Sequence, residues 1–371
     1  MLETSRPIEQ VRYPVHFTGE NKETRRPKST DDDSLASYYA KEEEKRMSMK
    51  VAYIFNEPLK HYAQQLGIKY AVTGPNPRKY QPYANVWDYG VLREKAQEVK
   101  DAGMEWSVLE GIGFIDGVKL GRENRDEEIA HFCTLLENLG KLGVGCVCYN
   151  WMPVWGWFRT STNVELAGGA LVSEFDIEAV KDLPPMAGVT ISKDQLWCNL
   201  EYFLKKVVPV AEKTGVKLAI HPDDPPIDHL GGLDRILTSA DAMYEVTQIV
   251  QSEYNGICLC QGNFAAMGED IPACIRRFAA NGTLHFAHFR DIVGDKNHFR
   301  EAWHHDGQTD MHECMKAYYE VGFDGVMRPD HVPTMYGDDN NNPGYAILGN
   351  LVATGYMFGL MESVEKELGL R

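Results

Sequence analysis

Short apolar runs alternate with segments of helical periodicity along most of the chain. From residue 51 onward each run is closed by Gly, Pro, Asn or Asp and is followed by a stretch in which apolar residues recur at helical spacing. The eight runs are residues 51–55, 70–74, 105–110, 143–149, 217–221, 256–260, 284–288 and 325–330. The helical candidates are residues 59–66, 91–102, 126–142, 194–214, 239–252, 271–280, 310–321 and 345–367. This alternation predicts an α/β protein built as a closed (β/α)8 TIM barrel.

The first 48 residues do not follow this alternation. They are rich in charge, with charged runs at residues 31–33 and 42–46, and they contain few aliphatic side chains that could form a core. We therefore expect a polar N-terminal extension over residues 1–48 and a barrel catalytic domain over residues 49–371. Tyr38 and Tyr39 could dock the extension on the barrel or on a neighbouring subunit.

One connection within the barrel is unusually long. About forty residues, 153–193, separate the fourth strand from its helix, and a loop of this length is usually functional. Because it leaves the C-terminal end of a strand, we expect it over the mouth of the barrel. Trp155, Trp157 and Arg159 at its start could form a lid or part of a subunit contact. A surface insertion with a few packed aromatic residues is an equally good interpretation.

The net charge and the lack of a long apolar run limit the kinds of partner and the location that we expect. The formal net charge of −16 would repel a phosphate backbone, so nucleic acid is not an expected partner. The same field would disfavour an anionic substrate unless the site itself supplied a cation. No run reaches the length of about eighteen apolar residues that a membrane span needs, and the N-terminus lacks a signal-peptide pattern. We therefore expect a soluble, cytoplasmic protein with no membrane partner, and its eight cysteines to be reduced core residues.

Four consecutive strands end in residues that can bind a metal ion. His221 closes the fifth strand, Cys260 the sixth, His288 the seventh and Asp330 the eighth. In a (β/α)8 barrel the active site lies at the C-terminal ends of the strands, so these four side chains can converge. Two imidazoles, a thiolate and a carboxylate suit a borderline divalent metal. Each residue alone has a plain structural explanation, but their coincidence on adjacent strands favours a metal site.

Strand parity brings further candidates to the same side of the sheet. Residues two apart point the same way, so Arg290 accompanies His288, Asp223 accompanies His221, and Arg328 accompanies Asp330. We expect Arg290 to clamp a substrate carboxylate, because its guanidinium offers a planar fork of donors. For Arg328 a structural ion pair is the favoured interpretation.

Two residues after the eighth strand could transfer protons. His331 directly follows Asp330 at the rim, and a histidine can donate or accept a proton near neutral pH. Tyr345 follows a turn rich in Gly, Asn and Pro, which could fold it back over the barrel mouth. An exposed loop histidine is the alternative interpretation of His331.

These residues occur in stretches that resemble the mannonate dehydratase family. The matching stretches are Cys-Tyr-Asn-Trp-Met-Pro-Val (148–154), His-Pro-Asp-Asp-Pro-Pro (221–226), Phe-Ala-His-Phe-Arg (286–290), Gly-Phe-Asp-Gly-Val-Met-Arg-Pro-Asp-His (322–331) and Gly-Tyr-Ala-Ile (344–347). The resemblance extends from about residue 49 to residue 368 and therefore covers nearly everything but the extension.

The resemblance implies D-mannonate as substrate and 2-dehydro-3-deoxy-D-gluconate as product. It implies a divalent metal, Mn2+ or alternatively Fe2+, bound by the same four strand-end residues, with His331 and Tyr345 as the acid and base. We expect Asn150, in the first matching stretch, to bind substrate together with Arg290 and Asp223. The partner is thus a small sugar acid, and we expect a homo-oligomer.

Two other functions remain open. A metal-dependent sugar isomerase or epimerase on the same barrel would move a proton without losing water. A non-catalytic sugar-acid binding protein would keep the metal ligands while its recognition residues changed. The presence of His331 and Tyr345 argues against the binding protein. The first strand argues for it, because it reads Tyr-Ile-Phe-Asn (53–56) where the family commonly has Trp-Tyr-Gly.

Overall fold

Eight parallel strands close into a barrel in the computed structural model, which describes residues 49–74 and 86–371. The barrel strands, in their order around the barrel, are β1 (Lys50–Ile54), β2 (Tyr70–Thr73), β3 (Glu105–Glu110), β4 (Cys146–Asn150), β7 (Lys217–His221), β10 (Asn255–Cys260), β11 (Leu284–Phe289) and β14 (Val326–Pro329). All eight correspond to the apolar runs of the sequence, so the (β/α)8 prediction is confirmed. The expected N-terminal extension, residues 1–48, lies outside the described residues.

The register of neighbouring strands aligns their C-terminal ends. Cys260 pairs with His288 across β10 and β11, and His288 pairs with Arg328 across β11 and β14. On the other side of the site, Asn150 pairs with His221 across β4 and β7. Side chains alternate between the two faces of a strand, so this register decides which strand-end residues point into the barrel at the same height.

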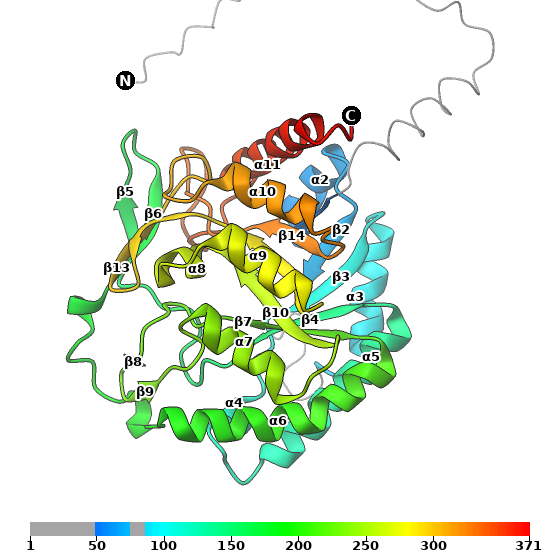
Figure 1. The fold of residues 1–371 in the computed structure, drawn as a ribbon, viewed down its shortest axis with the longest axis vertical. Helices are drawn as coiled ribbons and strands as arrows, with labels where there is room; N and C mark the ends of the chain where they lie inside the picture. The colour runs from blue at the N-terminus through cyan, green and yellow to red at the C-terminus, as the bar shows by residue number, and fades with distance from the viewer. Residues whose placement is uncertain (1–48, 75–85) are drawn as a thin grey trace, which may run out of the picture. The chain divides into compact units, whose positions relative to one another are not determined.

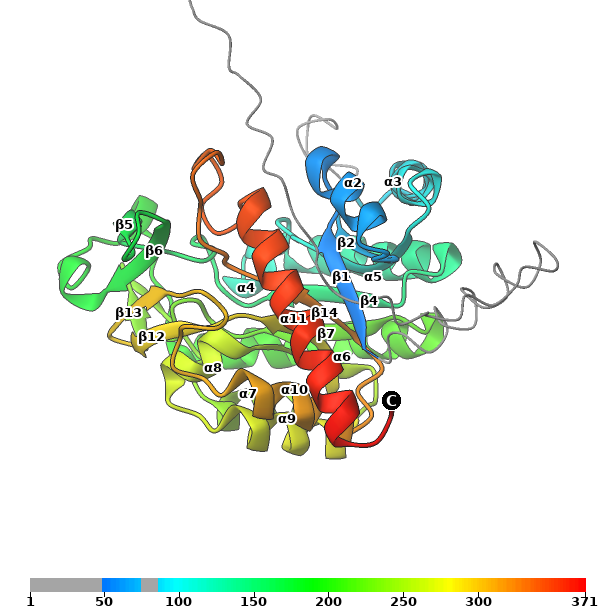
Figure 2. The same ribbon diagram turned by 90° about the horizontal axis from the view of Figure 1, so that it is seen from above.

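Helices surround the strands, as Figures 1 and 2 show. They are α2 (Glu57–Gln65), α3 (Tyr89–Asp101), α5 (Arg125–Leu142), α6 (Lys193–Thr214), α7 (Ala240–Ile249), α9 (Ile271–Ala280), α10 (Met311–Glu320) and α11 (Ile347–Glu367). Most begin at a capping residue whose side chain accepts a hydrogen bond from the first turn, as Ser192 does for α6 and Asp310 for α10. The sequence pattern did not predict the short helices α4 (Asp116–Lys119) and α8 (Gln261–Met267).

Helix α11 is long and apolar enough to cross a membrane, by length and composition alone, and among the described residues it is the one helix that is. It occupies the eighth helical position of the barrel and contacts α10, α2 and β14. Ala353, Met357, Met361 and Val364 on its inner face are buried. The apolar composition therefore has an explanation in barrel packing.

The connection after β4 is not the structureless loop that its length suggested. It contains the strands β5 (Ser161–Glu165) and β6 (Leu171–Asp176) and two short 3-10 helices, Ile177–Ala179 and Met186–Gly188. After β11, the strands β12 (Ile292–Asp295) and β13 (His298–Glu301) join them in an antiparallel sheet of order β12-β13-β6-β5. Figure 1 shows β5, β6 and β13 projecting together from one side of the barrel. Between β7 and α7 lies a further small hairpin, β8 (His229–Leu230) and β9 (Leu233–Asp234).

Small side chains and thiols fill the barrel interior. The interior cluster consists of Ala52, Val72, Val108, Cys146, Cys148, Ala219, Cys258, Phe286 and Val326. All eight cysteines are free, and six of them are buried as expected of core residues, whereas Cys198 is exposed and Cys133 is half-buried. The middle of the barrel is thus a packed core.

We expect Phe203→Ala to lower the free energy of unfolding by about 3–5 kcal/mol, the usual effect of truncating a buried aromatic residue. Phe203 on α6 is fully buried, and its ring lies 5.0 Å from that of Phe132 and 5.3 Å from that of Trp151. Lys205→Ala, an exposed change on the same helix, should stay within about 0.5 kcal/mol of wild type. Denaturant unfolding measures both, and equal effects would contradict this account of the α5–α6 packing.

Candidate active site

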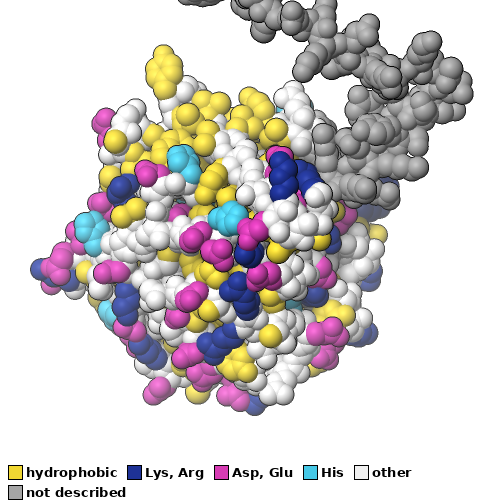
Figure 3. All heavy atoms as spheres, turned by 45° about the horizontal axis from the view of Figure 1, so that its top comes forward, with side chains coloured by type: hydrophobic (Ala, Val, Ile, Leu, Met, Phe, Trp, Pro, Cys, Tyr) yellow, Lys and Arg dark blue, Asp and Glu magenta, His cyan; other side chains and the backbone are white. Residues whose placement is uncertain are grey.

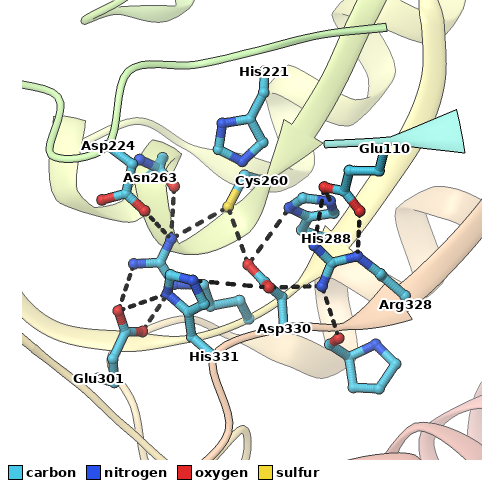
Figure 4. A network of polar contacts seen from close by, with 12 residues as sticks. Glu110, His221, Asp224, Cys260, Asn263, His288, Glu301, Arg328, Asp330 and His331 are labelled. Atoms are coloured by element: carbon cyan, nitrogen blue, oxygen red, sulfur yellow. Dashed lines mark hydrogen bonds and ion pairs between the residues drawn. The ribbon is translucent and has the colours of Figure 1, made fainter. Parts of the chain in front are cut away.

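The four predicted metal-binding residues meet at the C-terminal rim of the barrel (Figure 4). The ligand atoms of His221, Cys260 and His288 all lie within 4.8 Å of one another. Asp330 joins them, with Oδ2 3.5 Å from Nδ1 of His288 and 4.0 Å from Sγ of Cys260. Two imidazoles, one thiol and one carboxylate from four neighbouring strands therefore surround a single point.

The hydrogen bonding of the two histidines fits a metal ion. His288 is buried, yet neither of its ring nitrogens makes a hydrogen bond of good geometry within the described residues. Leaving such nitrogens unsatisfied is costly, and coordination is one way to satisfy them. In His221, Nδ1 lies 2.7 Å from the carbonyl oxygen of Pro222, so an Nδ1–H there leaves Nε2 free to bind. The donor set as a whole fits a divalent metal ion.

Cys260 is prepared to act as a thiolate. Burial opposes ionisation of its thiol, but the Arg290 guanidinium and the neighbouring imidazoles of His221 and His288 outweigh burial and lower the pKa of Cys260 to about 5. By contrast, burial raises the pKa of Cys258, two residues earlier on the same strand, well above its usual value. The two thiols of one strand therefore differ in charge near neutral pH.

A cavity of about 400 Å³ opens above this group. Its wall includes His221, His288 and Asp330, together with both predicted proton-transfer residues, His331 and Tyr345. Gly156 and Trp157, from the long connection after β4, also line it, so that connection does reach the barrel mouth. Acidic and basic side chains are interspersed over the face of the molecule in Figure 3. The cavity is large enough for a small sugar acid.

His331 is held by a carboxylate that the sequence did not reveal. Its Nδ1 lies 3.0 Å from Oε1 of Glu301, which ends β13. Donation of the Nδ1 proton to Glu301 leaves Nε2 as the ring nitrogen that can accept a proton. The ring also lies 5.2 Å from the ring of Trp157, between centroids. His331 is buried and therefore is not the exposed loop histidine of the alternative interpretation.

Tyr345 folds back over the mouth, as its turn suggested. The backbone N–H of Val332 donates to the carbonyl of Gly344, and the Tyr345 ring lies 5.6 Å from the His331 ring, between centroids. Gly344 has φ 86°, and a Cβ there would lie 3.3 Å from Cδ2 of His331. Loss of solvation, reinforced by the charge of Asp330, raises the pKa of Tyr345 well above its usual value. The phenol is therefore neutral.

Arg290 does not line the cavity, which corrects its predicted role as a clamp on the substrate carboxylate. Its side chain is fully buried, with Nε and Nη2 donating to Glu301 at 2.8 and 2.7 Å. Nη1 is shared among Asp224, Asn263 and the sulfur of Cys260 at 3.1, 2.7 and 3.4 Å. Because protein groups already occupy its donors, Arg290 acts as an internal counter-ion.

Asp223 also lies away from the cavity wall, so its prediction as a substrate contact is corrected as well. Its Oδ2 accepts hydrogen bonds from the backbone N–H groups of Ile236 and Leu237 at 3.0 and 2.8 Å. This carboxylate ties the loop after β7 to the segment before α7. The neighbouring Asp224 lines the cavity and forms an ion pair with Arg159.

Asn150 and Arg328 do line the cavity. Asn150 is oriented by the buried Lys119, whose Nζ lies 3.2 Å from Asn150 Oδ1. Arg328 donates to Asp330 at 2.6 Å and to both oxygens of Glu110 at 3.0 and 3.1 Å, so the expected structural ion pair is present. Glu110 ends β3, and its position at a strand end was a signal that could have identified it from the sequence.

A second group of buried charges lies beside the first. Glu301 and Asp224 are bound by the same two guanidiniums, those of Arg159 and Arg290. Burial opposes ionisation of Glu301, but Arg290, His331 and Arg159 outweigh it and lower the pKa of Glu301 to about 2. No sequence signal marked Glu301, because it lies in a hairpin of the long-range antiparallel sheet.

We expect Glu301→Gln to lower the free energy of unfolding by about 3–5 kcal/mol, because it leaves two buried guanidiniums with one carboxylate. The matched control is Glu320→Gln, which breaks an exposed pair with Arg276 and should cost less than about 1 kcal/mol. Urea unfolding of both variants measures the difference. If Glu301→Gln is as mild as the control, the buried network does not stabilise the rim.

Comparison with known proteins gives the family. A sequence profile of the D-mannonate dehydratase (UxuA) family matches residues 57–190 and 186–369. The mannonate dehydratase of Thermotoga maritima is 33% identical over 321 residues, covering 77% of this chain and 88% of its own length. That of Streptococcus uberis is 33% identical over 312 residues, covering 77% of this chain and 89% of its own length.

Solved structures agree with this result. The crystal structure of mannonate dehydratase from Streptococcus suis serotype 2 matches with a TM-score of 0.80 at 32% identity, covering 86% of this chain and 95% of that chain. A D-tagatose 3-epimerase-like protein matches with a TM-score of 0.57 at 13% identity, covering 87% of this chain and 100% of that one, which shows a shared fold alone. The chain therefore belongs to the D-mannonate dehydratase (UxuA) family of hydro-lyases.

Proposed function

We propose that this protein removes water from D-mannonate to give 2-dehydro-3-deoxy-D-gluconate, using a divalent metal ion held by His221, Cys260, His288 and Asp330. The observation that carries the proposal is that His221, His288 and Asp330 of this donor group line one cavity whose wall also carries His331 and Tyr345. Mn2+ is the ion we propose, with Fe2+ as the alternative, because imidazole and carboxylate donors suit both. Membership of the mannonate dehydratase family supports the substrate.

The charge of the substrate requires a cation at the site. When bound, the metal ion supplies Lewis-acid polarisation of the substrate oxygens. Arg328 adds a second positive charge, and it is the one Lys or Arg among the described residues that line the cavity. We assign to it the electrostatic attraction of the substrate carboxylate, in place of Arg290. Asn150, whose Oδ1 already accepts from Lys119 and from the backbone N–H of Met152, is suited to donate a hydrogen bond from Nδ2 to a substrate hydroxyl.

His331 and Tyr345 carry the two proton transfers. The proton on C2 is weakly acidic because its removal places negative charge on the neighbouring carboxylate, so one group must act as a base. The hydroxyl on C3 must take up a proton to leave as water, and the resulting enol becomes the 2-keto acid. Glu301 keeps His331 in the tautomer with Nε2 free. The neutral phenol of Tyr345, close to that ring, supplies a donor.

The direct test is mass detection of water loss across a panel of aldonates, with and without Mn2+. We expect D-mannonate to lose one water and give a 2-keto-3-deoxy acid, detectable by carbonyl chemistry. Protein treated with a chelator should be inactive and should recover on addition of Mn2+. A product of unchanged mass would instead identify an isomerase or epimerase. Binding of the sugar acid without turnover would identify a binding protein.

We expect His331→Asn and Tyr345→Phe each to lower kcat by about 10²–10⁴-fold, the usual contribution of a positioned acid or base. Elemental analysis should find the metal content unchanged, because neither residue belongs to the proposed ligand set. His298→Asn and Tyr336→Phe are matched controls on exposed side chains and should keep wild-type turnover. The assignment of proton transfer is wrong if both site variants, with metal bound, turn over at the wild-type rate.

A further inference from the structure

A second group of metal-binding side chains lies inside the barrel. The ligand atoms of Cys148, Cys258 and His288 lie within 4.8 Å of one another, and all three residues are buried. Cys148 is on β4 and Cys258 is on β10, with β7 between them, so the two thiols approach each other across the barrel interior. Cys258 precedes Cys260 by two residues and shares its face of the strand. This group therefore lies one layer deeper than the proposed active-site group.

His288 belongs to both groups, and its two nitrogens face different neighbours. Nδ1 lies 3.5 Å from Oδ2 of Asp330, on the side of the outer group. Nε2 lies 3.1 Å from Oε1 of Glu110, and Glu110 pairs in register with Cys148 across β3 and β4. Among the described residues neither nitrogen makes a hydrogen bond of good geometry. The ring thus presents Nδ1 to Asp330 of the outer group and Nε2 to Glu110, beside the strand that carries Cys148.

We propose that Cys148, Cys258 and His288 form a second metal site, selective for thiophilic divalent ions such as Zn2+ and Cd2+. Two thiolates and one imidazole form a soft donor set, which favours these ions over Mn2+ or Mg2+. The outer group differs because it has one thiolate and a carboxylate. On binding, two metal–sulfur bonds form, the two thiol protons pass to solvent, and the two thiolates balance the charge of the ion.

An ion can reach this site from the cavity. Cys148 and His288 line the cavity wall, and Cys258 lies behind them in the core. Because His288 is common to both groups, an ion in the inner site engages an imidazole that the outer group also requires. The inner site is therefore a place where a soft metal ion would interfere with the outer one. This inference rests on the side-chain geometry and does not depend on the proposed reaction.

The sulfur count around a bound ion tests the proposal without any mutation. The full-length protein, stripped of metal by chelation, is loaded with one equivalent of Cd2+ and studied by X-ray absorption. We expect two sulfur neighbours for each cadmium, because the inner site has two thiolates, whereas the outer group offers only Cys260. One sulfur neighbour, or none, would overturn the proposal.

Variants then identify the two sulfurs. In a Cys260→Ala background we expect the sulfur-to-cadmium charge-transfer absorption to persist, and to be lost when Cys148→Ala or Cys258→Ala is added. Cys146→Ala is the matched control, since Cys146 is a buried thiol of the same interior cluster on the same strand as Cys148, outside both groups. Circular dichroism checks folding. Absorption that survives the loss of both Cys148 and Cys258 would assign the sulfurs to other cysteines and overturn the proposal.

Discussion

The alignment of parallel strands in a closed barrel is the constraint on which the site depends. All eight strands run the same way, so their C-terminal ends form one rim. The register then sets Cys260 beside His288 and His288 beside Arg328. A shift of one residue in β11 would turn His288 outward to the helices, because successive side chains point to opposite faces. The convergence of His221, Cys260, His288 and Asp330 is thus a consequence of the backbone register of the barrel strands.

Most of the charged side chains at the rim of the barrel are buried, so their charges must be balanced by other side chains and not by water. Two groups of ion pairs do this. Arg328 bridges Glu110 and Asp330, while Arg159 and Arg290 share Asp224 and Glu301. Burying an unpaired charge costs several kcal/mol, so each arginine allows carboxylates to remain ionised in the interior. The same pairs have a chemical effect, because Arg290 favours the thiolate of Cys260 and Glu301 selects the tautomer of His331.

Much of the site was predictable because its residues end strands. His221, Cys260, His288 and Asp330 each follow an apolar run directly, and fold geometry brings such positions together. His331 and Tyr345, the second expected mainly from resemblance to the family, both line the same cavity. The roles of Arg290 and Asp223 were wrong for one physical reason. Strand parity gives the face of the sheet on which a side chain lies. It does not tell whether the hydrogen-bonding groups of that side chain are already used by a buried partner, as Glu301 uses those of Arg290 and a backbone N–H uses that of Asp223.

By itself the sequence determined the order of the eight barrel strands and of the eight long helices that alternate with them, the residues at the strand ends, and the acidic balance that calls for a cation at the site. These properties depend on local periodicity and composition, which are readable along the chain. Only the tertiary structure decided that Glu301 holds His331, that β5 and β6 pair with β12 and β13, and that Cys148 and Cys258 approach the same histidine. Those contacts join residues of different elements, 30 positions apart for Glu301 and His331 and more than a hundred apart for β6 and β13, and no local pattern encodes such contacts.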